Sequence, residues 1–219
     1  MEEQSDGTLL DAWSGGDAEA FTVLVRRHEG PVLRYAQALL GNWRGGEDVV
    51  QEVFLRLSQK PPTLPEHAVG DAEAERSLLS GWLHQVTRNL CMDTKRSEHR
   101  RRHREEAVAS LETDGGGIDT VEARDTRAAV ERGLSKLPSE QREVLALRLF
   151  GEKSYKEIAG ITGKKIGTIG WLVSVGLKSL AGDLAPLLQA PGPVDAAARA
   201  PGQSPGQRTG IQSLPGGLS

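Results

Sequence analysis

The sequence predicts an all-α protein of two small helical domains joined by a flexible linker, the C-terminal one carrying a helix-turn-helix. Three observations lead to this prediction. Apolar residues recur at three- and four-residue steps along several stretches, which is the spacing of one face of an α-helix. No stretch alternates apolar and polar residues for long enough to predict a strand. A glycine-rich, charged segment separates two helical parts, and 219 residues leave room for two small domains.

Residues 8–58 follow a helical pattern. A stripe of apolar and aromatic side chains runs from Phe21 to Leu39 at helical spacing, as expected for a helix with one buried face. Within this stripe Pro31 follows Gly30. Because proline lacks the N–H group that a helix interior needs, the pair predicts a break, with Pro31 in the first turn of a new helix.

The rest of the predicted N-terminal domain, residues 1–104, continues this pattern. Residues 41–46 are rich in glycine and predict a turn, and residues 47–58 predict a second helix. Residues 59–75 contain three prolines and predict a loop. A third helical stretch is expected over residues 76–104.

Composition then marks the remaining divisions of the chain. Residues 105–124 contain three consecutive glycines and many charges, which predicts a flexible linker. Helical patterning returns over residues 125–188, the predicted C-terminal domain. Residues 189–219 consist largely of Ala, Pro, Gly and Gln, so we expect a disordered tail that cannot bury enough apolar surface to fold.

The C-terminal domain contains the clearest local signal. Ser154 and Glu157 form the pattern of a capping box, in which each side chain bonds the backbone N–H of the other residue. A short helix follows, and residues 160–163 predict a tight turn in which Gly163 takes a positive φ. A second helix is expected from Lys165 onward. Two helices joined by such a turn are typical of the helix-turn-helix, whose second helix enters the major groove of DNA. The apolar stripe expected in the second helix is Ile169, Leu172, Val173 and Leu177.

Charge is distributed unevenly along the chain. The net charge is only −3, yet residues 76–104 contain eight Lys or Arg against Asp93 and Glu98 alone. A concentrated basic stretch on a mildly acidic protein is typical of nucleic-acid binding. The alternative interpretation is a solvated, charged helix face.

The sequence also predicts the compartment. Cys91 is the only cysteine, so no internal disulfide can form, and its apolar neighbours predict a small buried side chain. The N-terminal MEEQSDG has none of the hydrophobic character of a signal peptide, and no run of about 18 apolar residues occurs. We therefore expect a cytoplasmic protein without membrane insertion.

Three segments in order resemble one family of proteins. GGEDVVQEVFLRL at 45–57 resembles the helix by which sigma factors dock on the clamp of core RNA polymerase. The segment at 81–102 resembles the helix that reads and opens the minus-ten promoter element, and the segment at 134–169 resembles the C-terminal promoter-binding domain. Their order and spacing are similar to those of the extracytoplasmic-function sigma factors, and the resemblance covers roughly residues 10–185. It implies core RNA polymerase and promoter DNA as partners, and it leaves open an anti-sigma factor as a third.

The resemblance assigns polymerase contacts to the helix at 47–58. Its polar residues at three- and four-residue steps share a face that differs from the apolar one. The polymerase-binding residues that it implies are Asp48, Gln51, Glu52, Phe54 and Leu55. The alternative for this helix is a solvated face with ordinary core packing, above all at Phe54.

The resemblance assigns promoter contacts to the basic stretch. Its cations can neutralise phosphates, which would make binding strongly salt-dependent, and Asn89 and Asp93 lie one turn apart and can hydrogen-bond bases. The DNA-binding residues implied here are Arg88, Asn89, Asp93, Lys95, Arg96, Arg100 and Arg101. The preceding loop resembles the family poorly, so no base-pocket residue is assigned to it.

The second helix of the helix-turn-helix departs from the family pattern. Family members have several Arg and Lys after the Gly-Thr-Val-like step, whereas this chain continues with Gly170, Trp171, Leu172 and Val173. Because base readout depends largely on Arg, Asn and Gln, this departure puts sequence-specific upstream contacts in doubt. The DNA contacts retained here are Lys164, Lys165 and Thr168, while Trp171 and Val175 are expected as exposed apolar groups.

Three functions were therefore compared. The first is a sigma factor that binds core polymerase and directs promoter-specific initiation. The second is a sigma-derived interaction protein that binds polymerase or a regulator but has weakened promoter recognition. The third is a metal protein, since His99 and His103 have metal-binding spacing, but the surrounding arginines would repel a cation. The sequence favours the first, with no catalytic residue, no metal and no cofactor.

Overall fold

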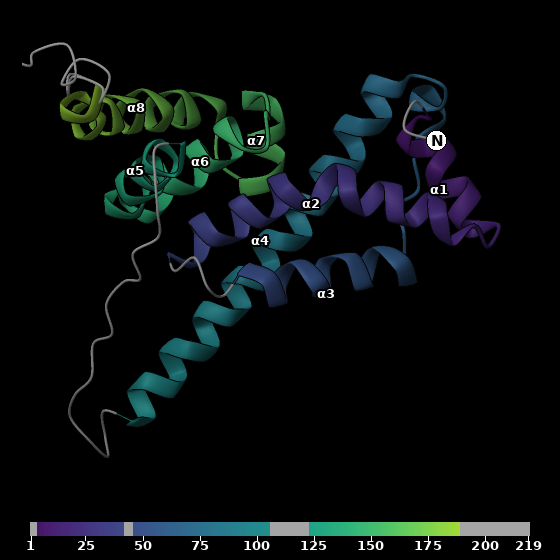
Figure 1. Cartoon of the computed structure of the whole chain (residues 1–219), viewed down its shortest axis with the longest axis horizontal. Helices are drawn as coiled ribbons and strands as arrows, with labels where there is room; N and C mark the ends of the chain where they lie inside the picture. The colour runs from purple at the N-terminus through teal and green to yellow at the C-terminus, as the bar shows by residue number, and fades with distance from the viewer. Residues whose placement is uncertain (1–3, 42–45, 106–122, 189–219) are drawn as a thin grey trace, which may run out of the picture.

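The computed structural model describes residues 4–41, 46–105 and 123–188, and every regular element in these ranges is helical (Figure 1). The prediction of an all-α fold is thereby confirmed. The predicted tail lies outside the described residues, as does nearly all of the predicted linker. The elements are α1 (Asp6–Ser14), α2 (Ala18–Leu40), α3 (Gly46–Gln59), the short 3-10 helix η1 (Glu66–Ala68), α4 (Ala72–Glu105), α5 (Ala123–Lys136), α6 (Ser139–Leu149), α7 (Tyr155–Thr162) and α8 (Ile166–Leu188).

Helix α2 is continuous through Pro31, so the predicted break is wrong. A proline nitrogen cannot donate to the carbonyl four residues earlier, which weakens one turn of the helix. Buried side chains before and after Pro31, including Leu24, Val32 and Tyr35, hold both halves against the same core. Tertiary packing therefore outweighs the local helix-breaking tendency. The helix ends at Leu40 and is capped by Gly41, whose φ of 74° is the left-handed conformation that favours glycine.

Helix α4 begins earlier than the sequence predicts. Asp71 accepts hydrogen bonds through Oδ1 from the backbone N–H groups of Glu73 (3.0 Å) and Ala74 (3.1 Å), which satisfies two donors at the helix start. The first four residues of α4 therefore lie within the segment predicted as a loop. The C-terminal end of the same helix projects away from the other helices (Figure 1), and Arg96, Arg100 and Arg101 are exposed there.

The capping box of α7 is confirmed. Ser154 Oγ accepts from the Glu157 N–H at 3.3 Å, and Glu157 Oε2 accepts from the Ser154 N–H at 2.8 Å. The helix extends to Thr162, two residues beyond the predicted start of the turn, and Gly163 then takes the predicted positive φ, 72°.

The stripe that buries α8 differs from the prediction at one position. Ile169, Leu172 and Val173 are buried as expected, but Leu177 is exposed and Leu180 is buried in its place. The reason is helix geometry, because at 100° per residue Leu180 returns to within about 20° of Ile169, while Leu177 lies about 80° away.

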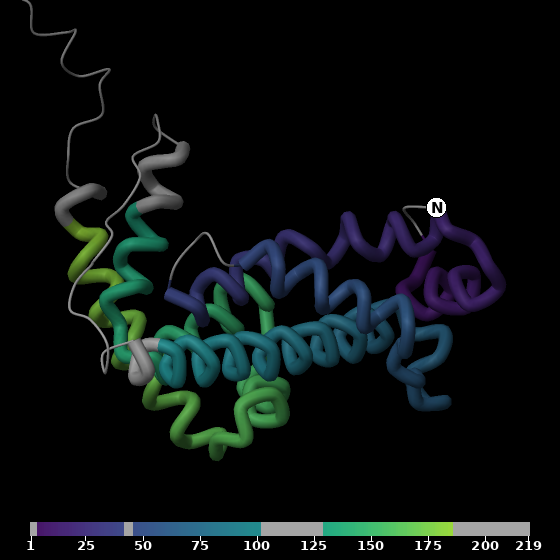
Figure 2. The backbone as a smooth tube through the Cα atoms, turned by 90° about the horizontal axis from the view of Figure 1, so that it is seen from below, coloured from purple at the N-terminus to yellow at the C-terminus, as the bar shows by residue number. Residues whose placement is uncertain are grey.

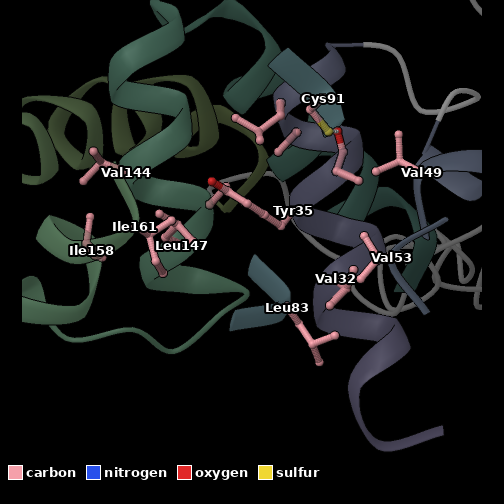
Figure 3. Packing of buried hydrophobic residues seen from close by; sticks show 14 of the residues in the cluster. Val32, Tyr35, Val49, Val53, Leu83, Cys91, Val144, Leu147, Ile158 and Ile161 are labelled. Carbon is pink, nitrogen blue, oxygen red and sulfur yellow. Dashed lines mark hydrogen bonds between the residues drawn. The ribbon is translucent and has the colours of Figure 1, made fainter. Parts of the chain in front are cut away.

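The N-terminal helices α1–α4 and the C-terminal helices α5–α8 pack against each other. Helix α6 lies on α2, and α7 lies on α4 (Figure 2). Buried side chains from both groups form one cluster, and Figure 3 shows Tyr35 of α2 between Leu147 and Ile161 on one side and Val53 on the other. Cys91 is fully buried in this cluster, which confirms its predicted packing role, and burial raises the pKa of its thiol to about 12.

Candidate functional site

Helix α3 presents a polar face to solvent. Asp48 and Gln51 are exposed, Leu55 is 50% exposed, and Glu52 is partly exposed and accepts from Arg56 Nε at 2.8 Å. The four predicted residues therefore form one stripe along the helix. This face is exposed to solvent because the helix packs into the core through its opposite face, which carries Val49, Val53 and Leu57.

The fifth predicted residue of this helix lies elsewhere. Phe54 is only 7% exposed and belongs to the hydrophobic core. Its aromatic ring stabilises the position of α3, so Phe54 is not part of the exposed stripe formed by Asp48, Gln51, Glu52 and Leu55. Removing a phenylalanine from such a site costs about 3–5 kcal/mol of folding free energy.

Helix α4 brings together four of the residues predicted to contact DNA. A groove of ≈ 550 Å³ is lined by the side chains of Arg88, Asn89, Met92, Lys95, Arg96 and His99. These residues share one side of the helix because they follow each other at three- and four-residue steps. The groove therefore combines cations, one amide and one apolar side chain.

The other predicted contacts on α4 lie beside this groove or beyond it. Asp93 is exposed and accepts a hydrogen bond from Arg96, one turn further along the helix. Arg100 and Arg101 are exposed on the projecting end of α4. From Arg88 to Arg101 the basic residues therefore extend over about three and a half turns of the helix.

One end of the groove is occupied by the C-terminal half of the protein. Arg88 Nε donates to Glu143 Oε1 of α6 at 2.7 Å, with the Arg88 side chain 25% exposed and that of Glu143 7% exposed. Lys95 lies close by, and burial together with the nearby Arg142 guanidinium lowers the pKa of its ammonium group. Glu143 was not identified from the sequence, because no local pattern links it to a residue 55 positions away.

A second polar contact joins α4 to the start of α7. Lys153 Nζ donates to the Ser77 carbonyl at 3.3 Å and to Glu157 Oε1 at 3.2 Å, and Ser77 Oγ donates to the same Oε1 at 2.8 Å. Burial tends to raise the pKa of Glu157, but hydrogen bonds from Ser154 and Ser77 and the Lys153 charge lower it to about 2. The carboxylate of the capping box therefore also holds the two helical groups together.

His84 is buried beside this contact. Its Nδ1 lies 2.7 Å from the Ser80 carbonyl, its ring lies 5.2 Å from the Tyr35 ring, and its Nε2 faces Gly151. Burial lowers the pKa of His84 to about 4, with a further lowering from the Lys153 charge. His84 is therefore neutral at physiological pH, and a side chain larger than hydrogen at Gly151 would collide with it.

The helix-turn-helix carries the three remaining predicted residues. Lys165 and Thr168 are exposed at the start of α8, whereas Lys164 is partly buried and forms an ion pair with Glu140 of α6. Trp171 is 61% exposed, as predicted, but Val175 is half-buried. The first turns of α8 therefore expose one large aromatic side chain and few cations.

Comparison with protein families matches both helical groups. Residues 24–101 match the model "Sigma-70 region 2" and residues 127–180 match the model "Sigma-70, region 4". The chain is 32% identical over 180 residues to the ECF RNA polymerase sigma factor SigE of Mycolicibacterium smegmatis, covering 76% of this chain and 63% of SigE. It is 30% identical over 168 residues to the ECF RNA polymerase sigma factor SigM of Mycobacterium tuberculosis, covering 76% of this chain and 78% of SigM.

The fold is similar to that of solved sigma factors. A co-crystal structure of the sigma factor RpoE with the anti-sigma factor NepR from Bartonella quintana matches with a TM-score of 0.53 and 25% identity, covering 71% of this chain and 91% of RpoE. None of the described helices is long and apolar enough to cross a membrane. The two region matches, their order along the chain and the identity to SigM show that this chain belongs to the extracytoplasmic-function family of RNA polymerase sigma factors, which direct transcription initiation.

Proposed function

We propose that this protein binds core RNA polymerase through the exposed face of α3 and recognises and opens promoter DNA through the basic groove of α4 and the helix-turn-helix. The stripe of Asp48, Gln51, Glu52 and Leu55 is the single observation that carries the proposal. Its polar and apolar groups remain exposed beside a fully packed face, and such a mixed surface suits docking onto another protein.

The groove of α4 supports promoter binding. Cations that neutralise phosphates release counterions, and exposed Arg96, Arg100 and Arg101 extend along the same helix for this purpose. Asn89 is exposed and its amide accepts only a long hydrogen bond, 3.4 Å, from Gln85, so it is available to a base. We infer that the α4 groove takes the minus-ten element.

The proposed role requires no covalent chemistry by this chain and no cofactor. Polymerase and chromosomal DNA meet in the cytoplasm, which is where we place the protein. The RpoE structure contains an anti-sigma factor, NepR, and we propose a partner of this class for the present chain as well.

The second candidate function is a sigma-derived interaction protein that binds polymerase or a regulator and has weakened promoter recognition. It is favoured by the few cations on α8 and by Lys164, two residues before this helix, which is already paired with Glu140. The two functions make different predictions about initiation, because only a sigma factor produces specific transcript starts.

The test is run-off transcription on fragmented genomic DNA with purified core polymerase. We compare wild type, the double variant Asp48→Ala/Gln51→Ala, and the control Asp11→Ala/Glu29→Ala, which alters exposed side chains outside α3. Specific starts that disappear only in the α3 variant would support the proposal. A chain that binds core but initiates nowhere would favour the interaction protein, and a chain that does not bind core would refute the sigma-factor proposal.

A further inference from the structure

The outer face of α8 carries one prominent side chain. Trp171 is 61% exposed and lies about 160° around the helix from Ile169, the centre of the buried stripe. The residues one turn away are Gly167 and Thr168 before it and Ser174 and the half-buried Val175 after it, and Lys178 follows about 10 Å along the axis. The indole is therefore the largest group that this helix offers to a partner at its N-terminal half.

The chemistry of α8 limits the usual way of reading bases, since Lys178 is its one residue of the type that hydrogen-bonds guanine. Its sequence contains no Arg, Asn or Gln, so it cannot form the bidentate hydrogen bonds by which these residues distinguish guanine and adenine. The base feature that an apolar side chain recognises in the major groove is the 5-methyl group of thymine. Hydroxyl groups such as that of Thr168 can hydrogen-bond to any base edge and add little discrimination.

We propose that Trp171 is a specificity-determining residue that recognises thymine methyl groups in the major groove of the upstream promoter element. This inference rests on the proposed function, since it requires the helix-turn-helix to bind promoter DNA. An added Cβ at Gly163 or Gly167 would meet no atom within 4 Å, so the backbone there is open to close approach by a large ligand. Lys165 and Lys178 lie near the two ends of this face and can each meet a phosphate.

The surroundings of Trp171 favour DNA over a protein partner. A protein interface has a contiguous apolar centre, but the exposed neighbours of the indole on this face are Gly167, Thr168, Ser174 and Lys178, and the one apolar neighbour, Val175, is half-buried. The other exposed apolar residues of α8, Ile166 and Leu177, lie about 140° and 120° around the helix from Trp171. A single aromatic group between cations fits a groove lined by phosphates.

The test uses deoxyuridine, which differs from thymidine only by the missing methyl group. A promoter mapped by the run-off experiment is prepared with every upstream-element thymine replaced by uracil, and in a matched version only the spacer thymines are replaced. Holoenzyme affinity for each DNA is measured with wild type, Trp171→Ala and the control Ile166→Ala, which removes an exposed apolar group from another side of α8. Circular dichroism confirms that each variant is folded.

We expect uracil in the upstream element to weaken wild-type binding about fourfold for each contacted methyl group, the factor provided by burying one methyl-sized apolar group. Trp171→Ala should bind thymine DNA more weakly and lose its sensitivity to uracil, while Ile166→Ala should retain both. Equal wild-type affinity for the two DNAs, or full uracil sensitivity in Trp171→Ala, would overturn the inference and assign the indole to a protein contact. If the run-off experiment yields no specific transcript start, the proposed function itself is overturned. This outcome is reached before any uracil-containing DNA is tested, so it is distinct from failure of the inference about Trp171.

Discussion

Protonation of His84 should destabilise the protein in mildly acidic solution. The imidazole is 1% exposed, between the ring of Tyr35 and the backbone at Gly151, where the N-terminal and C-terminal helices meet. The charge of the Lys153 ammonium group also opposes protonation of His84 and so lowers its pKa. A proton on His84 would therefore place a second positive charge in a buried site beside an existing one.

The magnitude follows from the two pKa values. Burial lowers the pKa of His84 from 6.5 to about 4, so the unfolded chain binds the proton more tightly than the folded one. Stability is then fully present above pH 6.5 and is lost as the pH falls toward 4. Linkage gives a loss of about 2 kcal/mol between pH 7.5 and pH 5 from this one side chain. Glu157, with its pKa lowered to about 2, contributes little in this window because it is ionised in both states.

The assay is urea unfolding followed by circular dichroism at pH 7.5 and pH 5, for wild type and His84→Gln. Wild type should lose about 2 kcal/mol more than the variant between the two pH values. The packing free energy that His84→Gln loses is the same at both pH values, so it cancels when the pH dependences of the two proteins are compared. An NMR titration in which His84 protonates near 6.5, or equal pH dependence in the two proteins, would refute the reasoning.

Three further predictions concern single side chains. Glu143→Gln should lower the free energy of unfolding by urea by about 2 kcal/mol because it leaves the partly buried Arg88 without its charge partner. Glu140→Gln, whose carboxylate is 63% exposed, should lower it by less than about 0.5 kcal/mol. Ser154→Ala should lower the free energy of unfolding by about 1 kcal/mol through loss of the α7 cap; an unchanged urea midpoint would contradict this. Cys91, with its pKa raised to about 12, should resist iodoacetamide at about pH 8 until urea unfolds the chain, and rapid native labelling would show that the thiol is accessible.

Local patterns predicted much of the fold. The capping box at Ser154 and the positive φ of Gly163 depend on a few neighbouring residues, so they can be recognised from sequence alone. The burial of Cys91 likewise follows from its position in a helical stripe. The exposed polar stripe on α3 was predictable for the same reason, because periodicity separates two faces of one helix.

Features that depend on packing between distant segments were not predictable. Pro31 was expected to break its helix, and only contacts on both sides of it keep α2 continuous. Phe54 and Leu55 are adjacent in the chain, yet the Phe54 ring packs into the core and the Leu55 side chain is exposed to solvent. The bond between Arg88 and Glu143 joins residues that no short pattern relates.

The ion pair between Arg88 and Glu143 has a thermodynamic consequence for DNA binding. With Arg88 acting on phosphate as proposed, the Glu143 carboxylate neutralises the Arg88 charge and would repel a phosphate brought to the same guanidinium, so helix α6 and the promoter compete for this charge. The apparent affinity of the free chain for DNA is then its intrinsic affinity multiplied by the fraction of molecules in which α6 has moved away. A partner that binds only the form in which α6 has moved away would raise that fraction. With core polymerase as this partner, the protein would bind DNA well only after it has bound polymerase.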